Sequence, residues 1–300
     1  MPDTNANQDT SANDAVTFKH LKPLVGSEVL NVDLTRPMSD ATFARIRKEM
    51  CERGALVIRG QSMTPEQHIA FSRRFGALEH HVLNNFCLAD HPEIFVVSNI
   101  MEGGKHVGAY DGSKTYHIDL SYMQVPSLGS VFYCLEHPPI GSGGETSVIN
   151  MSAVYEALPE EKRTFFAGRG AVHDYVWNYE RVHTDRPPLT EEQKQRVPPV
   201  THPAVCTHPE TGRDVLYIDD NFFRRFEGTG DEESREIVED LIAFADQDQF
   251  RYVHAWTPGD VLIWDNRSSI HKRLPFDTEN TRRLMHRTTI IGEKPFHKAS

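Results

Sequence analysis

The sequence predicts a mainly β fold with flanking α-helices, of the double-stranded β-helix type, a cupin-like jelly roll. Two observations support this class: many short apolar runs are separated by turn residues, and only a few segments have helical periodicity. The chain has 300 residues, and no Ser/Gly-rich linker divides it. We therefore expect a disordered polar tail over residues 1–15 and a single domain over residues 16–300.

The first predicted element is an amphipathic helix over residues 39–53. Phe43, Ile46 and Met50 lie on one face of it, at the spacing of a helix that buries one side. Residues 55–58 are all apolar and predict a short strand directly after this helix.

A second helix is predicted to begin at Thr64. Pro65 occupies its first turn, and Gln67 completes a capping box with Thr64. Gly76 is the expected C-cap, because glycine readily takes the left-handed conformation that ends many helices. The other predicted elements are, in chain order, strands at 94–98 and 129–135, a Gly-rich turn at 141–144, helices at 152–158 and 231–245, and a buried strand at 261–264 after a turn at 258–260.

Two segments are predicted to be irregular. The Gly-rich turn is not a phosphate loop, because no Lys-Ser or Lys-Thr follows it, and its expected role is to turn Thr146 toward a pocket. Residues 186–203 are rich in proline, so we expect a loop there, which could lie over the functional site.

Composition excludes several classes of protein. The formal net charge of −11 argues against a nucleic-acid partner, because phosphate binding needs a basic face. The four cysteines are widely spaced, without a C-x-x-C pair, as expected of reduced thiols. No apolar run approaches the roughly 18 residues that predict a membrane span, and residues 1–15 lack the regions of a signal peptide. We therefore expect a cytoplasmic protein with no membrane partner.

The most informative motif is His117-Ile118-Asp119, with His271 far downstream. In a strand, residues two apart point to the same face, so His117 and Asp119 can converge on one ion. Two imidazoles and one carboxylate form a facial triad that holds ferrous iron and leaves positions open for substrate and oxygen. His271 follows the buried strand at 261–264 and is the expected third ligand.

The dipeptide spacing alone is weak evidence, because the chain has 16 histidines and His183 and Asp185 repeat it. Carboxylate variants also begin at His91 and His208. Context separates them: the copy at His183 precedes an Arg-Pro-Pro stretch that predicts an exposed loop. We therefore interpret the motif at His117 as the metal site.

Basic residues gather near the C-terminus. If residues 283–287 are extended, Arg283 and Arg287 share one face of a strand. A planar guanidinium donates two hydrogen bonds to a carboxylate, so the pair suggests two anionic groups near the metal. A solvated basic edge strand is the plainer alternative. The full basic cluster is Lys272, Arg273, Arg282, Arg283 and Arg287, which in an acidic chain fits a small anionic ligand.

With these motifs in place, the chain resembles the iron(II)/2-oxoglutarate-dependent dioxygenases of the taurine dioxygenase/TfdA type. The resemblance runs from about Val25 to Phe296. Its most specific pieces, in the family's order, are residues 57–61 (VIRGQ), 71–76 (FSRRFG), 116–119 (YHID), 143–146 (GGET), 264–271 (WDNRSSIH) and 283–287 (RLMHR). For this family a jelly-roll fold is expected, and a homo-oligomer, dimer or tetramer, is implied.

The resemblance also implies roles for individual residues. His117, Asp119 and His271 would be the Fe(II) ligands. Thr146 and Arg283 would bind the distal carboxylate of 2-oxoglutarate. Arg287 would hold the acidic group of the substrate, and His81 stands where the family often has a second substrate contact. Leu120, Tyr122 and Phe222 are further candidates to shape the substrate pocket, each equally plausible as plain core.

The implied reaction consumes O2, decarboxylates 2-oxoglutarate to succinate and hydroxylates a small organic acid. Where the hydroxylated carbon carries a leaving group, the product would collapse to an aldehyde or ketone. Asp119 favours hydroxylation, because related halogenating enzymes lack this carboxylate.

Departures from the family pattern concern the substrate. Tyr116 stands where a tryptophan is usual, Ser113 lies near where taurine oxidisers have a polar amide, and residues 84–110 match neither well-known subtype closely. We therefore prefer a carboxylate substrate, small or aromatic. The alternative is a taurine, alkylsulfonate or alkylsulfate dioxygenase.

Two other classes stay open as remote alternatives. A zinc hydrolase also uses two histidines and a carboxylate, but no His-Glu-x-x-His helix is present, and zinc does not explain Thr146 or Arg283. A non-catalytic jelly-roll binding protein would be expected to have lost a ligand. Assays for 2-oxoglutarate turnover with iron and with zinc would separate the three.

Overall fold

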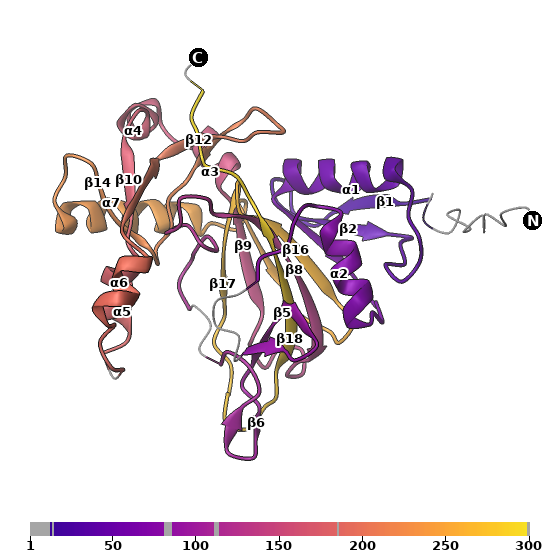
Figure 1. Cartoon of the computed structure of the whole chain (residues 1–300). Helices are drawn as coiled ribbons and strands as arrows, with labels where there is room; N and C mark the ends of the chain where they lie inside the picture. Colours follow the sequence, from indigo (N-terminus) through magenta and orange to yellow (C-terminus); the bar gives the residue numbers. More distant parts are fainter. Residues whose placement is uncertain (1–12, 14, 81–85, 111–113, 185, 299–300) are drawn as a thin grey trace, which may run out of the picture.

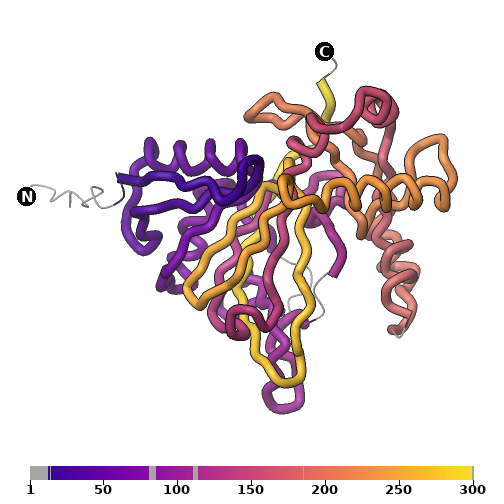
Figure 2. The backbone as a smooth tube through the Cα atoms, turned by 180° about the vertical axis from the view of Figure 1, so that it is seen from behind, coloured from indigo at the N-terminus to yellow at the C-terminus, as the bar shows by residue number. Residues whose placement is uncertain are grey.

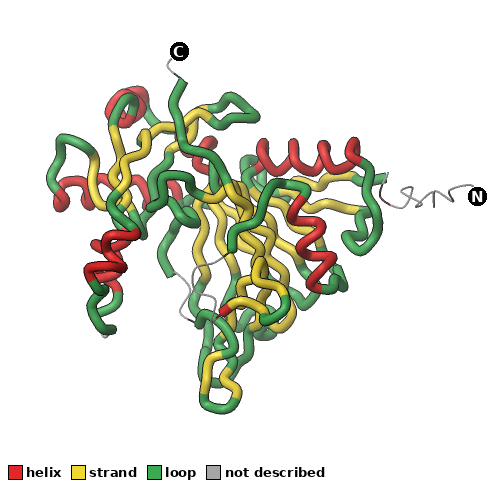
Figure 3. Tube along the Cα trace, viewed as in Figure 1, coloured by secondary structure: helices red, strands yellow, loops and turns green. Residues whose placement is uncertain are grey.

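The computed structural model describes residues 13, 15–80, 86–110, 114–184 and 186–298. Its centre consists of two β-sheets, and Figure 3 shows these strands gathered in the middle with helices at the flanks. The larger sheet has the strand order β1 (Thr17–His20), β2 (Ser27–Leu30), β3 (Ala55–Ile58), β16 (Val261–Asp265), β8 (Ser127–Glu136), β18 (Leu284–Ile291), β5 (His91–Ser98) and β4 (Cys87–Leu88). The smaller sheet has the order β15 (Arg251–His254), β9 (Thr146–Asn150) and β17 (Ser269–Arg273).

The helices and short strands lie around these two sheets (Figure 1). The helices are α1 (Asp40–Arg53), α2 (Pro65–Arg73), α3 (Met151–Ala157), α4 (Glu160–Phe166), α5 (Tyr175–Val182), α6 (Glu191–Arg196) and α7 (Asp231–Ala245). A three-stranded sheet has the order β11 (Val200–Pro203), β10 (Gly170–His173) and β14 (Phe223–Phe226), and two hairpins pair β12 (Val205–Thr207) with β13 (Asp214–Leu216) and β6 (Met101–Glu102) with β7 (Lys105–His106). This is the predicted fold class of a mainly β protein with flanking helices.

The core between the two sheets follows from the two-residue period of strands. Val57 on β3 and Val148 on β9 belong to the same buried cluster as Phe132, Trp264 and Met285. Their sequence neighbours point the other way, into two outer clusters. One outer cluster packs under α1 and α2, and the other under α3 and α7. Figure 2 shows α1 and α7 on opposite sides of the strands.

The first helix confirms its prediction closely. Ser39 is the N-cap of α1, and Phe43, Ile46 and Met50 are buried on one face. Gly54, with φ of 75°, ends the helix, and its N–H donates to the carbonyl of Met50. The chain can therefore enter β3 at once, as predicted.

The start of α2 is confirmed, but its predicted end is wrong. Thr64 and Gln67 form the capping box. Arg74, not Gly76, is the C-cap, and α2 ends at Arg73. The N–H of Phe75 donates to the carbonyl of Ser72, which tightens the chain into a turn. The N–H groups of Arg74 and Phe75 bond to carbonyls three residues back instead of four, and the Phe75 ring packs against Phe43, at 4.8 Å between centroids.

The expected loop at 186–203 contains regular structure. Helix α6 begins after Thr190, which forms a second capping box with Gln193, and β11 ends the segment. The capping box therefore starts a helix within a segment whose proline content predicted a loop. No residue of α6 is buried, so this helix does not form part of the core.

Three further expectations concern the N-terminal tail, membrane-spanning helices and the cysteines. Residues 1–12 and 14 of the predicted tail lie outside the described residues, whereas the Asn13 side chain is buried and donates to the carbonyls of Asp33 and Pro37. Among the residues that the structure describes, no helix combines the length and apolarity that crossing a membrane requires. All four cysteines are free thiols, as expected.

Candidate metal centre

The site begins with a backbone bridge between His117 and His271. Each N–H donates to the other residue's carbonyl at 3.0 Å, so His117 forms an isolated antiparallel bridge with His271 of β17. Their rings lie together, with centroids 4.2 Å apart. His271 comes from β17, whereas His117 precedes the turn at 118–121. The fold therefore joins two imidazoles from distant parts of the sequence.

Asp119 completes the group from two residues beyond His117. Its Oδ1 lies 3.8 Å from His117 Nε2, and its Oδ2 lies 3.7 Å from His271 Nε2. The three donor atoms lie within 4.8 Å of one another. Two ligand atoms bound at about 2 Å to one ion are separated by roughly 3–4 Å, so these residues fit a metal ion. The predicted triad is thus brought together.

The hydrogen bond of the His117 imidazole and the burial of His271 also fit a metal site. His117 Nδ1 lies 3.1 Å from the carbonyl of Thr115, which places the ring proton on Nδ1 and leaves the Nε2 lone pair free. The His271 ring is buried beside Trp264, at 4.2 Å between centroids. Burial, and then the neighbouring His117, hold the pKa of His271 well below its usual range. Both rings are therefore suited to be neutral ligands.

The carboxylate of Asp119 is held from several sides. Its Oδ2 accepts hydrogen bonds from Ser130 Oγ at 3.1 Å and Trp264 Nε1 at 3.2 Å. Its Oδ1 accepts from Arg287 Nη1 at 3.0 Å. Burial raises the pKa of Asp119, but the Arg287 charge and the two imidazoles outweigh it, so the pKa lies below its usual range. The group is an oriented anion, as a metal ligand must be.

The backbone after Asp119 makes an unusual turn. Leu120 has a φ of 60°, a left-handed conformation that is uncommon for a leucine. Asp219 holds both sides of this turn, because its Oδ2 accepts from Ser121 Oγ at 2.7 Å and from the Ile118 N–H at 3.4 Å. Its Oδ1 accepts the N–H groups of residues 221–223 at 2.6 to 3.1 Å. Asp219 therefore fixes the ligand-bearing loop, a role that no sequence motif indicated.

Thr146 and Arg283, the expected 2-oxoglutarate residues, are both buried at 3% exposure. Thr146 Oγ1 accepts from Trp256 Nε1 at 3.0 Å, and the Arg283 guanidinium lies over the Phe132 ring at 5.5 Å. The Gly-rich turn before Thr146 is needed, because a Cβ on Gly143 would lie 2.2 Å from the Pro275 carbonyl oxygen. Trp256 was not among the predicted site residues.

Two of the residues expected to shape the substrate pocket, Tyr122 and Phe222, lie in one aromatic cluster. The Tyr122 ring lies 4.6 Å from Phe222 and 4.8 Å from Tyr175 between centroids. Tyr122 follows Asp119 by three residues, so this aromatic cluster lies next to the ligand-bearing turn, and burial raises the pKa of Tyr122. Tyr175, at the start of α5, was missed in the sequence. His81 lies outside the described residues.

A second donor group, Cys51, His208 and Asp265, does not suit a metal ion. Arg267 Nη2 lies 2.7 Å from Asp265 Oδ2 and 3.3 Å from Cys51 Sγ, so a guanidinium occupies the centre. His208 Nδ1 accepts from the Glu210 N–H, so its Nε2 carries the proton and donates to Asp265. Asp265 and Arg267 of the WDNR motif thus form a buried ionic network.

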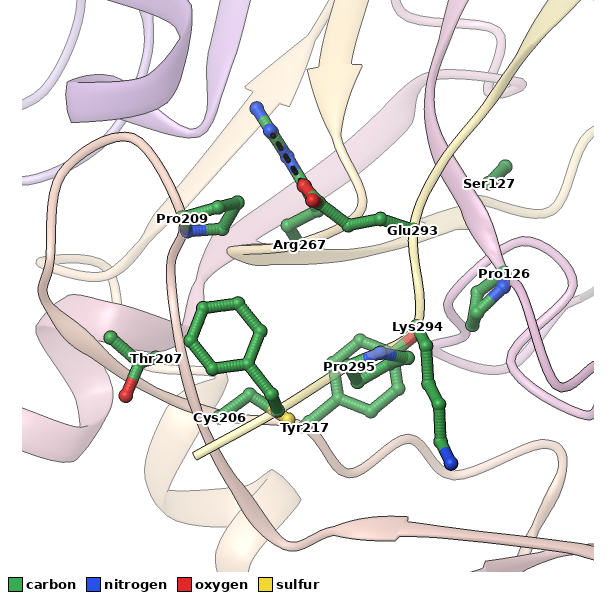
Figure 4. Close-up of a pocket in the computed structure, with 11 residues that line it drawn as sticks. Pro126, Ser127, Cys206, Thr207, Pro209, Tyr217, Arg267, Glu293, Lys294 and Pro295 are labelled. Atoms are coloured by element: carbon green, nitrogen blue, oxygen red, sulfur yellow. Dashed lines mark ion pairs between the residues drawn. The ribbon is translucent and has the colours of Figure 1, made fainter. Parts of the chain in front are cut away.

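The other candidate positions are separate from the triad. His183 is the C-cap of α5, and Asp185 lies outside the described residues. Glu93 pairs with Arg73 at 2.6 Å. Figure 4 shows a small hollow between Arg267 and the C-terminal segment, and none of the three triad residues lines it.

Comparison with known proteins places the chain among enzymes. The family model described as taurine catabolism dioxygenase TauD, TfdA family matches residues 17–289. An alpha-ketoglutarate-dependent 2,4-dichlorophenoxyacetate dioxygenase of Cupriavidus pinatubonensis is 32% identical over 286 residues, covering 92% of this chain and 98% of that protein. An (S)-phenoxypropionate/alpha-ketoglutarate dioxygenase of Sphingobium herbicidovorans is 31% identical over 281 residues, covering 89% and 92%.

Solved structures agree with the sequence comparison. The crystal structure of a taurine dioxygenase from Burkholderia xenovorans matches with a TM-score of 0.78 and 29% identity. The match covers 93% of this chain and 90% of that one. The similarity therefore extends over nearly the whole fold and includes both segments that carry the triad.

Proposed function

Because this chain belongs to the TauD/TfdA family and is an Fe(II)- and 2-oxoglutarate-dependent dioxygenase, we propose that it hydroxylates a small aromatic carboxylic acid. The observation that carries this proposal is the cluster of aromatic rings formed by Tyr122, Tyr175 and Phe222, which follows directly on the turn that carries Asp119. A guanidinium next to aromatic rings is complementary to an aryl acid.

We assign the iron ligands to His117, Asp119 and His271. When bound, Fe(II) supplies the oxygen chemistry that converts O2, 2-oxoglutarate and the substrate into succinate, CO2 and the hydroxylated product. The chain's own part is to position these ligands: Thr115 orients the first imidazole, and Ser130 and Trp264 orient the carboxylate. The two facing sheets that support these residues are the arrangement expected of a jelly roll.

We assign the distal carboxylate of 2-oxoglutarate to Arg283 and Thr146. Both are buried, so a carboxylate between them would be shielded from water and its charge-assisted hydrogen bonds would be strong. The Nε atom of Arg283 has no hydrogen-bond partner among the described residues, which leaves a donor for such a ligand. Trp256 orients the threonine hydroxyl from the other side.

We assign the acidic group of the substrate to Arg287. This guanidinium lies 5.2 Å from the centroid of the Phe95 ring and contacts Asp119, so an acid bound to it would lie close to the metal. The ring of an aryl substrate would then pack on Tyr122, Tyr175 and Phe222. Two relatives named for phenoxyacetate and phenoxypropionate support an aryl acid over an aliphatic one.

Two outcomes of the chemistry differ in their product. If the hydroxylated carbon carries an aryloxy group, the product collapses to an aldehyde or ketone and a phenol. If it carries no leaving group, the alcohol is released. The alternative substrate class is a taurine-like sulfonate or a sulfate ester. The similarity to a taurine dioxygenase structure supports this alternative.

The test is a succinate-production screen with Fe(II), O2 and 2-oxoglutarate. The panel contains phenoxyacetate, phenylacetate, an aliphatic carboxylate, taurine and an alkyl sulfate. We expect the aryl carboxylates to give the highest kcat/KM, and Tyr175→Ala to lower that value for aryl acids only. Faster turnover of taurine or the alkyl sulfate would overturn the aryl carboxylate proposal.

A further inference from the structure

The five basic residues near the C-terminus differ in whether an acidic partner balances them. Lys272 pairs with Asp246, Arg282 with Glu136, and Arg287 with Asp119, at 3.5, 2.9 and 3.0 Å respectively. For Arg273 and Arg283, no acidic partner lies within ion-pair distance in the part of the chain that the structure describes. These two guanidiniums therefore need a counter-charge from elsewhere.

Strand pairing places Arg273 beside Thr146. Arg273 is the last residue of β17, and its direct partner on β9 is Thr146. Directly opposed residues of an antiparallel pair put their side chains on the same face, about 5 Å apart. Arg273 also lies two residues beyond His271, so its side chain shares the face of that ligand. The residue therefore belongs to the wall that carries both the triad and Thr146.

The contacts of Arg273 leave most N–H groups of its guanidinium available. Its guanidinium lies over the Phe276 ring at 4.9 Å, and Nη1 makes one long hydrogen bond of 3.4 Å to the Leu274 carbonyl. The side chain is partly buried. A guanidinium has five N–H donors, so most of those on Arg273 lack a partner among the described residues.

Arg273 and Arg283 are also close enough to interact. Burial, and then the positive charge of Arg273, lower the pKa of Arg283. Two like charges in a largely buried space are unfavourable unless an anion lies between or beside them. A carboxylate at Thr146 would meet this condition, because Arg273 is opposite Thr146 and acts on Arg283.

We propose that Arg273 is a second guanidinium for the distal carboxylate of 2-oxoglutarate, and that it makes the co-substrate site selective for dicarboxylic 2-oxo acids. The inference rests on the proposed function, in which Arg283 and Thr146 bind this carboxylate. It adds a residue from a different strand, so the carboxylate would be held from β9, from β17 and from the residue that precedes β18.

The test is equilibrium dialysis of the full-length protein with Mn(II) in place of iron, so that binding is measured without turnover. Two ligands are compared: 2-oxoglutarate, and 2-oxopentanoate, in which a methyl group replaces the distal carboxylate. We expect Arg273→Met to raise the Kd for 2-oxoglutarate by about 10-fold or more, as for a lost charge-assisted contact. The Kd for 2-oxopentanoate should change less than about twofold, and Arg273→Lys should restore part of the loss.

Arg282→Met is the matched control, because Arg282 is next to Arg283 in sequence but is exposed and paired with Glu136. It should leave both Kd values unchanged. Circular dichroism checks that each variant is folded, and Arg273→Lys carries the comparison if the Met variant does not fold.

The possible outcomes separate this inference from the proposed function. If the wild-type protein does not bind 2-oxoglutarate, both are wrong. A second outcome is that the wild-type protein binds 2-oxoglutarate while Arg273→Met leaves that Kd unchanged, or raises the Kd values of both ligands equally. In either case only the proposed role of Arg273 is wrong.

Discussion

The guanidinium of Arg287 contacts the carboxylate of Asp119, with Nη1 3.0 Å from Oδ1. A residue expected to bind the substrate and a residue expected to bind iron therefore share one corner of the site. Asp119 has donors on both oxygens, since Ser130 and Trp264 occupy Oδ2. An acid group bound to Arg287 would hold the substrate directly beside the metal.

Loss of this guanidinium should weaken binding of the prime substrate and leave binding of 2-oxoglutarate unchanged. In Arg287→Ala we expect a higher substrate KM and more succinate formed per product, because a poorly held substrate is badly placed for reaction. The measurement is the KM for each substrate together with the succinate-to-product ratio. An unchanged substrate KM with tight coupling would refute the anionic substrate, and the search would then move to neutral or cationic compounds.

Replacement of any triad residue should abolish activity. His117→Ala, Asp119→Ala and His271→Ala should each eliminate substrate-dependent succinate formation while the far-UV circular dichroism stays near that of wild type, because an open three-ligand site tolerates no loss. His183→Ala, at the C-cap of α5, is the control and should be near neutral. Full activity in Asp119→Ala would show that the triad is wrongly assigned.

The co-substrate residues should act on 2-oxoglutarate alone. Arg283→Ala removes a charge-assisted partner, which costs about 2–3 kcal/mol, so the KM for 2-oxoglutarate should rise about 30- to 150-fold. Thr146→Ala should have a smaller effect on the same KM, because a neutral hydroxyl makes a weaker bond. If neither variant changes this KM, the 2-oxoglutarate pocket lies elsewhere.

Asp219 should matter for stability and for metal binding. Asp219→Ala leaves buried donors around residues 118–121 and 221–223 without an acceptor, which should cost about 2–4 kcal/mol of unfolding free energy. Mn(II) affinity should also fall, because the Asp119 loop loses its support. Asp248→Ala, which removes an exposed ion pair with Lys22, should leave the unfolding free energy close to that of wild type. Denaturant unfolding and Mn(II) titration measure both effects, and normal values in Asp219→Ala would contradict this role.

Stability should fall in mild acid because of His68. Burial lowers the pKa of His68 to about 4, whereas an unfolded histidine titrates near 6.5. As the pH falls, the unfolded state therefore takes up the proton before the folded state does. The contribution of His68 to the free energy of unfolding is present above about pH 6.5 and is lost as the pH falls toward 4. Between pH 7 and pH 5 this loss amounts to about 2 kcal/mol.

His68→Gln tests this pH dependence. A glutamine can still donate to the Val131 carbonyl, which His68 Nε2 contacts at 3.1 Å, but it cannot titrate. Denaturant unfolding at pH 5 and pH 7 should show a smaller difference for His68→Gln than for wild type. His106→Gln, at an exposed position, should keep the wild-type difference. Equal differences in His68→Gln and wild type would assign the acid sensitivity to other groups.

Elements with strong local signals could be predicted from the sequence. Helix α7 has the predicted bounds, and the capping box at Thr64 marks the start of α2 as expected. The same kind of capping box at Thr190 was overlooked, because the surrounding prolines suggested a loop. The local glycine signal at Gly76 predicted the wrong C-cap, because it does not include tertiary contacts such as the packing of Phe75 on Phe43 just beyond the helix.

The triad could also be predicted, because the residue types and the motifs around them are specific. The residues that support it could not. Asp219, Trp256 and Ser130 act only after distant segments meet, and a single aspartate, tryptophan or serine has no local pattern that indicates this. Cross-strand register, which places Arg273 opposite Thr146, is likewise a property of the folded sheets.

The backbone pairing of His117 with His271 has a consequence for how the protein is made. The two residues are separated by half of the chain, and the strand that carries the second lies close to the C-terminus. A chain emerging from the ribosome cannot form the triad until β17 has been synthesised and has paired with β9. Such long-range pairing slows folding. Iron would therefore load only after nearly the whole chain has folded, which keeps incomplete chains from holding a reactive metal.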